Sequence, residues 1–168
     1  DAKEQLGQFK EAQHLLLQAK ELAADPAEQA EIELRLRNTT RLAELEADAT
    51  ELLEKGEDEL AQAEPSYQDV LTRLGVAQNR VNSLQQEIER SLKDEQAASA
   101  SDAVRKIEQR IAALIDLAQA GVALSRAVNH SQQPDAWTTA RYEFEDALDL
   151  ALEAAKSSDS NVRAKAGL

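Results

Sequence analysis

The fold is decided by residues 65–88, which read PSYQDVLTRLGVAQNRVNSLQQEI. Aliphatic residues recur in this stretch at alternating steps of four and three: Val70, Leu74, Ala77, Val81, Leu84 and Ile88. Steps of three and four place side chains on one face of an α-helix, and their alternation is the heptad of a coiled coil. Pro65 suits a first helical turn, and Ser66 with Asp69 forms a capping box. The stretch therefore predicts a long helix that buries one face against a partner helix.

The partner helix is predicted to follow next along the chain. The same alternation recurs at Val104, Ile107, Ile111, Leu114 and Ala118. A polar, Ala/Ser-rich stretch from about Lys93 to Ser101 precedes it and is interpreted as a loop, with Ser99 and Asp102 as a second capping box. Two heptad helices joined by a short loop are expected to fold back on each other. Residues 65–128 are thus predicted to form an antiparallel coiled-coil hairpin.

Two helices are predicted before the hairpin. The first covers about Ala2 to Ala24, and the run Asp25-Pro26-Ala27-Glu28 carries the start signals of the second. The apolar stripe of the second helix is interrupted at residues 38–40, where a change of packing partner is expected. Gly56 either ends this helix or is a weak point within it.

One helix is predicted after the hairpin, beyond a polar break from Asn129 to Asp135 that closes with Pro134 as a helix starter. Its expected apolar face contains Trp137, Ala140, Phe144, Ala147, Ala151 and Ala154. Trp137, in the first turn, is expected to cap the end of a bundle. The predicted fold class is all-α, a bundle of about five helices with a central antiparallel coiled-coil hairpin, in one domain over residues 1–168. Because the chain opens on Asp1 and ends at Leu168 within a helical pattern, a fragment of a longer protein is expected.

The composition supports this class and narrows the function. Hydrophobic residues make up 42% of the chain, but aromatic residues only 3%, so the core is expected to be aliphatic. Acidic residues outnumber basic ones 32 to 19, which gives a net charge of −13. Binding to nucleic acid or to an anionic membrane needs clustered Lys and Arg, and neither partner is predicted. The most apolar stretch, Ile111–Val128, contains Asp116 and Arg126, so no membrane insertion is predicted.

The sequence contains no pattern typical of a catalytic or metal-binding site. The chain has no cysteine, which excludes thiolate catalysis and Cys-ligated metals. Glu11 and His14 form one half of a Glu-x-x-His pair, but no second copy is present, and His130 is remote in sequence. The acidic run Glu57-Asp58-Glu59 lacks the alternating ligands and glycine of a calcium loop and is interpreted as a solvated turn. The sequence therefore predicts no enzyme, no catalytic, cofactor-binding or metal-binding residues, and no cofactor.

The two ends of the chain carry a resemblance to a known family. Gly7, Phe9, Glu11 and Ala12, followed by Leu16, Ala19 and Leu22, resemble the second helix of a tetratricopeptide repeat. Phe144, Ala147, Ala151 and Ala154 echo the pattern near the C-terminus. The Trp, Leu-Gly and Tyr positions of the preceding helix of that repeat are absent at both ends. The resemblance implies a scaffold that packs helices closely through small residues.

Two functions remain open from the sequence. The first is a non-catalytic protein-interaction or scaffold module whose partner is another protein or a second copy of this chain. The alternative is an extracytoplasmic ligand-sensing bundle of a bacterial histidine kinase or chemoreceptor, which Leu114–Leu150 resembles in composition and helix length. The alternative predicts a polar cavity in which Arg126, Asn129 and Arg141 hold a small anion. The sequence does not indicate a compartment.

Overall fold

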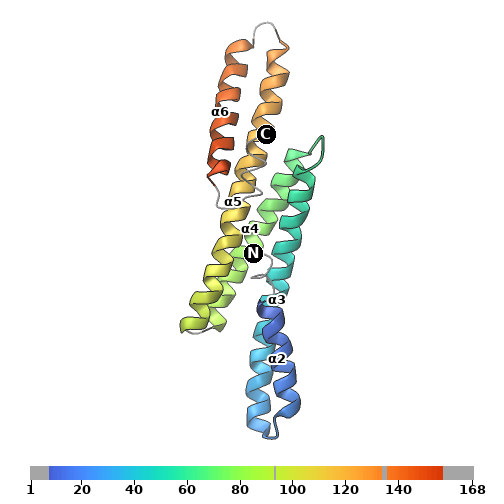
Figure 1. The fold of residues 1–168 in the computed structure, drawn as a ribbon, viewed down its shortest axis with the longest axis vertical. Coiled ribbons are helices and arrows are strands. Elements are labelled where there is room, and N and C mark those ends of the chain that lie inside the picture. The colour runs from blue at the N-terminus through green and yellow to red at the C-terminus, as the bar shows by residue number, and fades with distance from the viewer. Residues whose placement is uncertain (1–7, 93, 134–135, 157–168) are drawn as a thin grey trace. The chain divides into compact units, whose positions relative to one another are not determined.

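The computed structural model describes residues 8–92, 94–133 and 136–156, and confirms the all-α class. The described residues form five helices and no strand: α2 (Gln8–Leu22), α3 (Pro26–Leu60), α4 (Tyr67–Ser91), α5 (Asp94–Ser131) and α6 (Trp137–Ala155). Figure 1 shows their order along the chain. Gly7 of the repeat-like pattern and Pro134 of the helix-start signal lie outside the described residues.

The start of α3 follows its sequence signals. The backbone N–H of Ala27 donates to Oδ1 of Asp25 at 3.0 Å, so Asp25 satisfies one of the amides that a helix start leaves without a partner. The helix then continues through Gly56, which is buried inside it and does not end it. A Cβ added at Gly56 would lie 3.0 Å from Cδ2 of Leu74. Of the two readings of this glycine, the position within the helix is correct.

The loop predicted from about Lys93 to Ser101 is wrong. Helix α5 begins at Asp94 and includes the residues interpreted as a capping box, and at its other end it continues to Ser131, into the predicted polar break. The first turns of α5 contain neither glycine nor proline, and alanine favours the helix. Ala100 is also buried, which ties this segment to the rest of the protein. The loop prediction fails because a polar composition does not by itself interrupt a helix.

The molecule divides into two compact units, and the division falls within α3, α4 and α5. Unit 1 consists of residues 1–51 and 79–106, and unit 2 of residues 52–78 and 107–168. Each unit is described by itself below. The single domain expected from the sequence stays a prediction.

In unit 1, α2 lies beside the first part of α3 (Figure 1). Gln13 donates from Nε2 to Oγ1 of Thr40 at 3.0 Å, which joins the two helices. One residue later the partner changes, because Arg41 pairs with Glu87 of α4 at 3.5 Å. This is where the interrupted stripe predicted a change of partner. The buried residues of unit 1 come from α3, α4 and α5 and include Leu42, Ala49, Val81, Leu84, Ile88 and Val104.

In unit 2, the core is built by the remaining parts of the same three helices. Its buried residues include Leu53, Val70, Leu74, Ala77, Ile107, Ile111, Leu114 and Ala118. Every heptad position predicted in α4 and α5 is therefore buried, in one unit or the other. A bidentate ion pair lies beside this core: Arg110 donates from Nε and Nη2 to the two carboxylate oxygens of Glu57, each at 2.7 Å. The acidic run that contains Glu57 is thus helical, and its interpretation as a solvated turn is wrong.

Helix α6 lies beside the last part of α5 in unit 2 (Figure 1). Its buried residues are three alanines spaced by seven: Ala140, Ala147 and Ala154. Helix α5 has buried alanines at the same spacing: Ala113, Ala120 and Ala127. Small residues at heptad spacing let two helices approach closely. Trp137 and Phe144, predicted to be buried with the alanines, are instead exposed, so Trp137 does not cap a bundle by burial.

Candidate interaction surface

The α5/α6 pair in unit 2 leaves large apolar side chains in solvent. Seven of them are between 42% and 65% exposed. Tyr142 precedes Phe144 by two residues and so points to another side of α6. The other six are Leu124, Val128, Trp137, Phe144, Leu148 and Leu152. Scattered exposed leucines are normal on a protein surface, whereas a contiguous apolar patch marks an interaction site. Whether these six residues form a patch depends on which side of the helix pair they occupy.

The spacing along α6 places four of the six residues together. Trp137, Phe144, Leu148 and Leu152 follow one another at steps of seven, four and four, which keeps them on one side of a helix. In α5, Leu124 and Val128 are four residues apart and share a side for the same reason. Each helix therefore presents one apolar stripe beside its buried alanines.

One contact and one electrostatic interaction set the register between α5 and α6. Nδ1 of His130 lies 2.6 Å from Oε2 of Glu143. Further along, Glu153 lies close enough to Asp116 to raise the pKa of its carboxyl. Positions therefore increase along α5 as they decrease along α6, so the two helices are antiparallel. This register brings Val128 level with Phe144, and Leu124 level with Leu148.

The contact between His130 and Glu143 also shows which sides of the two helices match. Glu143 directly precedes Phe144 and is turned from it by roughly 100° around α6. His130 follows Val128 by two residues, so it points to nearly the opposite side of α5. The contact between His130 and Glu143 thus marks one side of the pair, and the two apolar stripes lie together on the other. We call these six residues the apolar face.

The electrostatics of α6 differ between its sides. Glu145 and Asp149 border the apolar face on the solvent side, and Arg141 within it is held by Glu145 at 2.9 Å. Lys156, just beyond α6, pairs with Glu153. On the side away from the apolar face, burial and then the nearby Glu153 raise the pKa of Asp116 above its ordinary value. Helix α6 is acidic overall, and the two bases near the apolar face, Arg141 and Lys156, are already in ion pairs.

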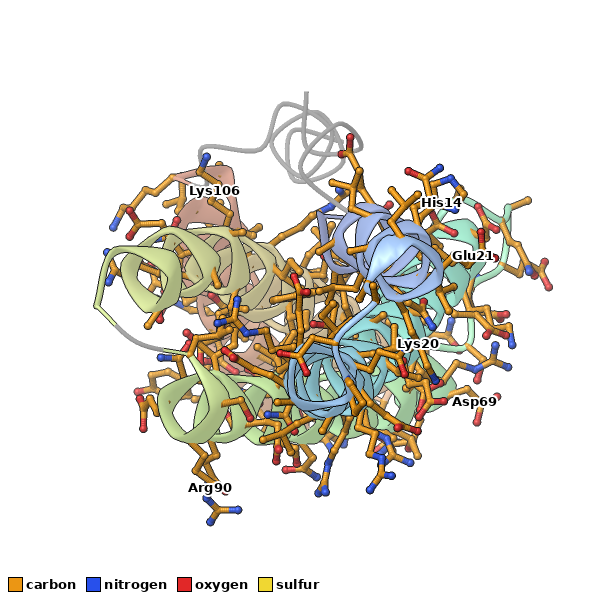
Figure 2. All side chains as sticks on the ribbon, turned by 90° about the horizontal axis from the view of Figure 1, so that it is seen from below. His14, Lys20, Glu21, Asp69, Arg90 and Lys106 are labelled. Atoms are coloured by element: carbon orange, nitrogen blue, oxygen red, sulfur yellow. The ribbon has the colours of Figure 1, made fainter. Side chains whose placement is uncertain are left out.

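The residues weighed for chemistry or ligand binding are dispersed. His14 is exposed and contacts Gln18 one turn later at 3.1 Å (Figure 2). Arg126 and Asn129 are exposed, and Arg141 is held by its ion pair, so no described contact gathers the three groups expected in the sensor alternative. In the part of the chain that the structure describes, no group of three or more potential metal ligands occurs.

Unit 1 offers one shallow depression of 480 Å³ and scattered bases. The depression is lined by α3 alone: Glu33, Leu36, Arg37, Thr40, Arg41 and Glu44. The bases and acids among these residues balance, and an ion pair joins Arg37 to Glu33 at 3.7 Å. Elsewhere in the unit, Arg90 and Lys106 point in different directions and do not gather into a basic patch (Figure 2). Neither feature favours a ligand as strongly as the apolar face favours a docked protein.

One segment of α5 has the length and composition of a membrane-spanning helix. Among the described residues, Ala100–Ser131 is long and apolar enough, by length and composition, to cross a membrane. Nearly half of its most apolar window, 44%, is buried inside the protein, and the core helix of a soluble protein passes the same test. This property therefore carries little weight, and the absence of membrane insertion stays a prediction.

Comparisons with protein-family models, curated proteins and solved structures find no match to this chain. The resemblance of the end helices to tetratricopeptide repeats therefore stays a prediction.

The apolar face was not predicted from the sequence. Phe144 and Trp137 were assigned to a buried stripe together with the alanines of α6. The available signal was the split between residue sizes, because alanines recur at every seventh position and the larger residues lie beside them. That split predicts a close helix contact with a second, larger apolar surface next to it.

Proposed function

We propose that this chain is a non-catalytic helical interaction module that docks another protein on the apolar face of α5 and α6. One observation carries the proposal: six large apolar side chains share one side of the α5/α6 pair, whereas the buried residues of α6 are all alanines. Leaving such side chains in water costs about 25 cal/mol for each Å² of apolar surface, and a docked partner removes this cost. An enzyme function has no comparable observation in its favour.

The scaffold itself is proposed to be an antiparallel coiled-coil hairpin of α4 and α5. Two contacts support it, one in each unit. In unit 1, Gln85 donates to Oγ of Ser101 at 3.2 Å, and these residues lie equally far from position 93. In unit 2, the ring of Tyr67 lies against Gly121, again at nearly equal distances from that position. In an antiparallel hairpin of α4 and α5, residues at equal distances from the connection lie opposite each other. Both contacts have this pattern.

Site-specific photo-crosslinking in cells of the source organism tests the proposed function. A photoreactive amino acid replaces Leu148 on the apolar face and, as a matched control, the exposed Asp146 on another side of the same helix. We expect one partner protein to crosslink through position 148 and not through position 146. Equal crosslinking at the two positions, or none at position 148, would overturn the proposal.

The sensor alternative stays a prediction from the sequence. Its three anion-binding candidates lie on exposed surface, and Arg141 is engaged by Glu145.

A further inference from the structure

We propose that the apolar face receives a basic amphipathic helix of a different protein. This inference rests on the proposed function and deepens it by naming the chemistry of the partner.

The partner is a helix because, among the described residues, no third helix packs on the α5/α6 pair as one does in the rest of unit 2. Where α3, α4 and α5 pack together, large aliphatic side chains such as Leu74, Ile111 and Leu114 are fully buried. Where α5 and α6 pack, the six large side chains of the apolar face remain exposed, and the buried residues of α6 are alanines. Two parallel stripes with a shared seam are the surface into which an amphipathic helix lays its apolar side. Such a helix would complete a three-helix arrangement like the one nearby.

The partner is basic because the border of the face is acidic. Glu145 and Asp149 flank the stripe of α6 on the solvent side, and Asp149 makes no ion pair with any described residue. The bases close to the stripe, Arg141 and Lys156, are neutralised by Glu145 and Glu153. Lys and Arg beside the apolar stripe of the incoming helix would therefore meet the unpaired carboxylate of Asp149, in a border where the acids outnumber the one base, Arg141.

The same charges disfavour the other occupants. Two copies of a chain with a net charge of −13 repel each other, and the acidic borders of the two faces would meet. An anionic membrane would face the same acidic border. A helix of the opposite charge is the occupant that both the shape and the charge of the face favour.

Titration of the whole chain with two synthetic helical peptides tests this inference. Both peptides carry leucines at heptad spacing and are long enough to span α6. One has lysine at the positions that flank the stripe, and the other has glutamate there. Trp137, the single tryptophan of the chain, is 65% exposed within the face, so its fluorescence reports docking directly. We expect the lysine peptide to shift Trp137 emission to the blue and to protect it from acrylamide, and the glutamate peptide to do neither.

A matched pair of variants shows where the peptide binds. Leu148 in the face and Leu34 in α3 of unit 1 are both 60% exposed. Leu148→Gln is expected to weaken binding of the lysine peptide by roughly tenfold or more, and Leu34→Gln to leave it unchanged. Circular dichroism confirms that both variants keep their helix content.

Several results would overturn the inference, and they are distinguishable from failure of the proposed function. Equal binding of the two peptides, or no binding of the lysine peptide, would exclude a basic helix. A concentration-dependent doubling of the molecular mass with a blue shift of Trp137 would identify a second copy as the occupant. The same shift with phosphatidylserine vesicles and not with the peptide would identify a lipid surface. In each case, selective crosslinking of a protein at position 148 would still uphold the interaction module.

Discussion

Individual residues of this protein show how small changes in size decide helix packing. Gly121 of α5 lies directly under the ring of Tyr67, and an added Cβ would come within 2.2 Å of Cε1. Gly75 in α4 has no atom within 4 Å of an added Cβ. Two glycines in helix interiors thus differ only in what surrounds them.

Gly121→Ala and Gly75→Ala are therefore expected to change stability in opposite directions. Alanine in place of glycine stabilises a helix interior by about 1 kcal/mol, and Gly75→Ala should gain roughly that amount. Gly121→Ala must displace the ring of Tyr67, and overpacking of this kind costs about 1–3 kcal/mol, so a net loss is expected. Chemical denaturation measures both values. A gain from Gly121→Ala would contradict the close approach of the two helices.

The bidentate ion pair of Arg110 with Glu57 tests whether burial strengthens an ion pair in this protein. The two side chains are only 17% and 15% exposed, so removal of one charge leaves the other poorly solvated. We expect Arg110→Ala to cost about 1–3 kcal/mol of unfolding free energy. Arg141→Ala breaks an exposed pair with Glu145 and should stay within about 0.5 kcal/mol. Equal losses in the two variants would show that burial does not strengthen the Arg110 pair.

Asp116 makes stability depend on pH. Burial, and then the nearby Glu153, raise its pKa in the folded protein above the ordinary value of 3.8. The folded state thus binds this proton more tightly than the unfolded state does. The contribution of Asp116 to stability is greatest below pH 3.8 and is lost as the pH rises through the folded pKa.

Asp116→Asn removes this dependence. At pH 7 we expect a gain of a few tenths of a kcal/mol, a small value because the side chain is partly solvated. The gain should vanish below pH 3.8, where the carboxyl is protonated in both states. Thermal unfolding of the variant and the native chain across this pH range measures it. A gain that grows at low pH would contradict the assigned direction of the shift.

At the scale of the helices, α6 is held by less apolar surface than its neighbours. Its buried contacts come from alanines, and each methyl group contributes only about 0.8 kcal/mol. The contact of His130 with Glu143 adds one polar interaction with α5. Helix α4, in contrast, buries valine, leucine and isoleucine along its whole stripe.

Amide hydrogen exchange should reveal this difference. We expect the amides of α6 to exchange through a local opening of lower free energy than those of residues 70–88 in α4. Mass spectrometry of peptic fragments resolves the two segments. Equal protection of α6 and α4 would mean that the alanine contact holds α6 as firmly as a leucine core.

The elements also show what a sequence can and cannot predict. The burial of the stripe from Val70 to Ile88 could be predicted because large aliphatic residues at heptad spacing are buried most efficiently against another helix. The start of α3 was readable because Asp25 and Pro26 act locally. The beginning of α5 was missed because alanine, serine and glutamine read as polar, although nothing among them interrupts a helix.

The exposure of Trp137 and Phe144 was missed for a different reason. Spacing along α6 shows which residues share a face, but the number of neighbouring helices is a property of the tertiary structure. Among the described helices, α6 lies beside α5, and it buries its alanines and leaves the larger residues exposed (Figure 1). The candidate site thus consists of the large apolar residues of α5 and α6 that the fold leaves exposed.

At the scale of the whole molecule, the account rests on an apolar face that is open in the isolated chain. The net charge of −13 opposes the association of copies of this chain through exposed apolar surface. The heptad core supports the face, and the alanine contact places both stripes on one side of the α5/α6 pair.

Acrylamide quenching of Trp137 in the purified chain tests this claim most directly. If the apolar face is open, Trp137 should show the emission of a water-exposed indole and efficient quenching, both unchanged as the protein concentration rises. Because Trp137 is the only tryptophan, no other residue contributes to the signal. A blue-shifted emission that acrylamide does not quench would show that the face is already covered, and would contradict the account.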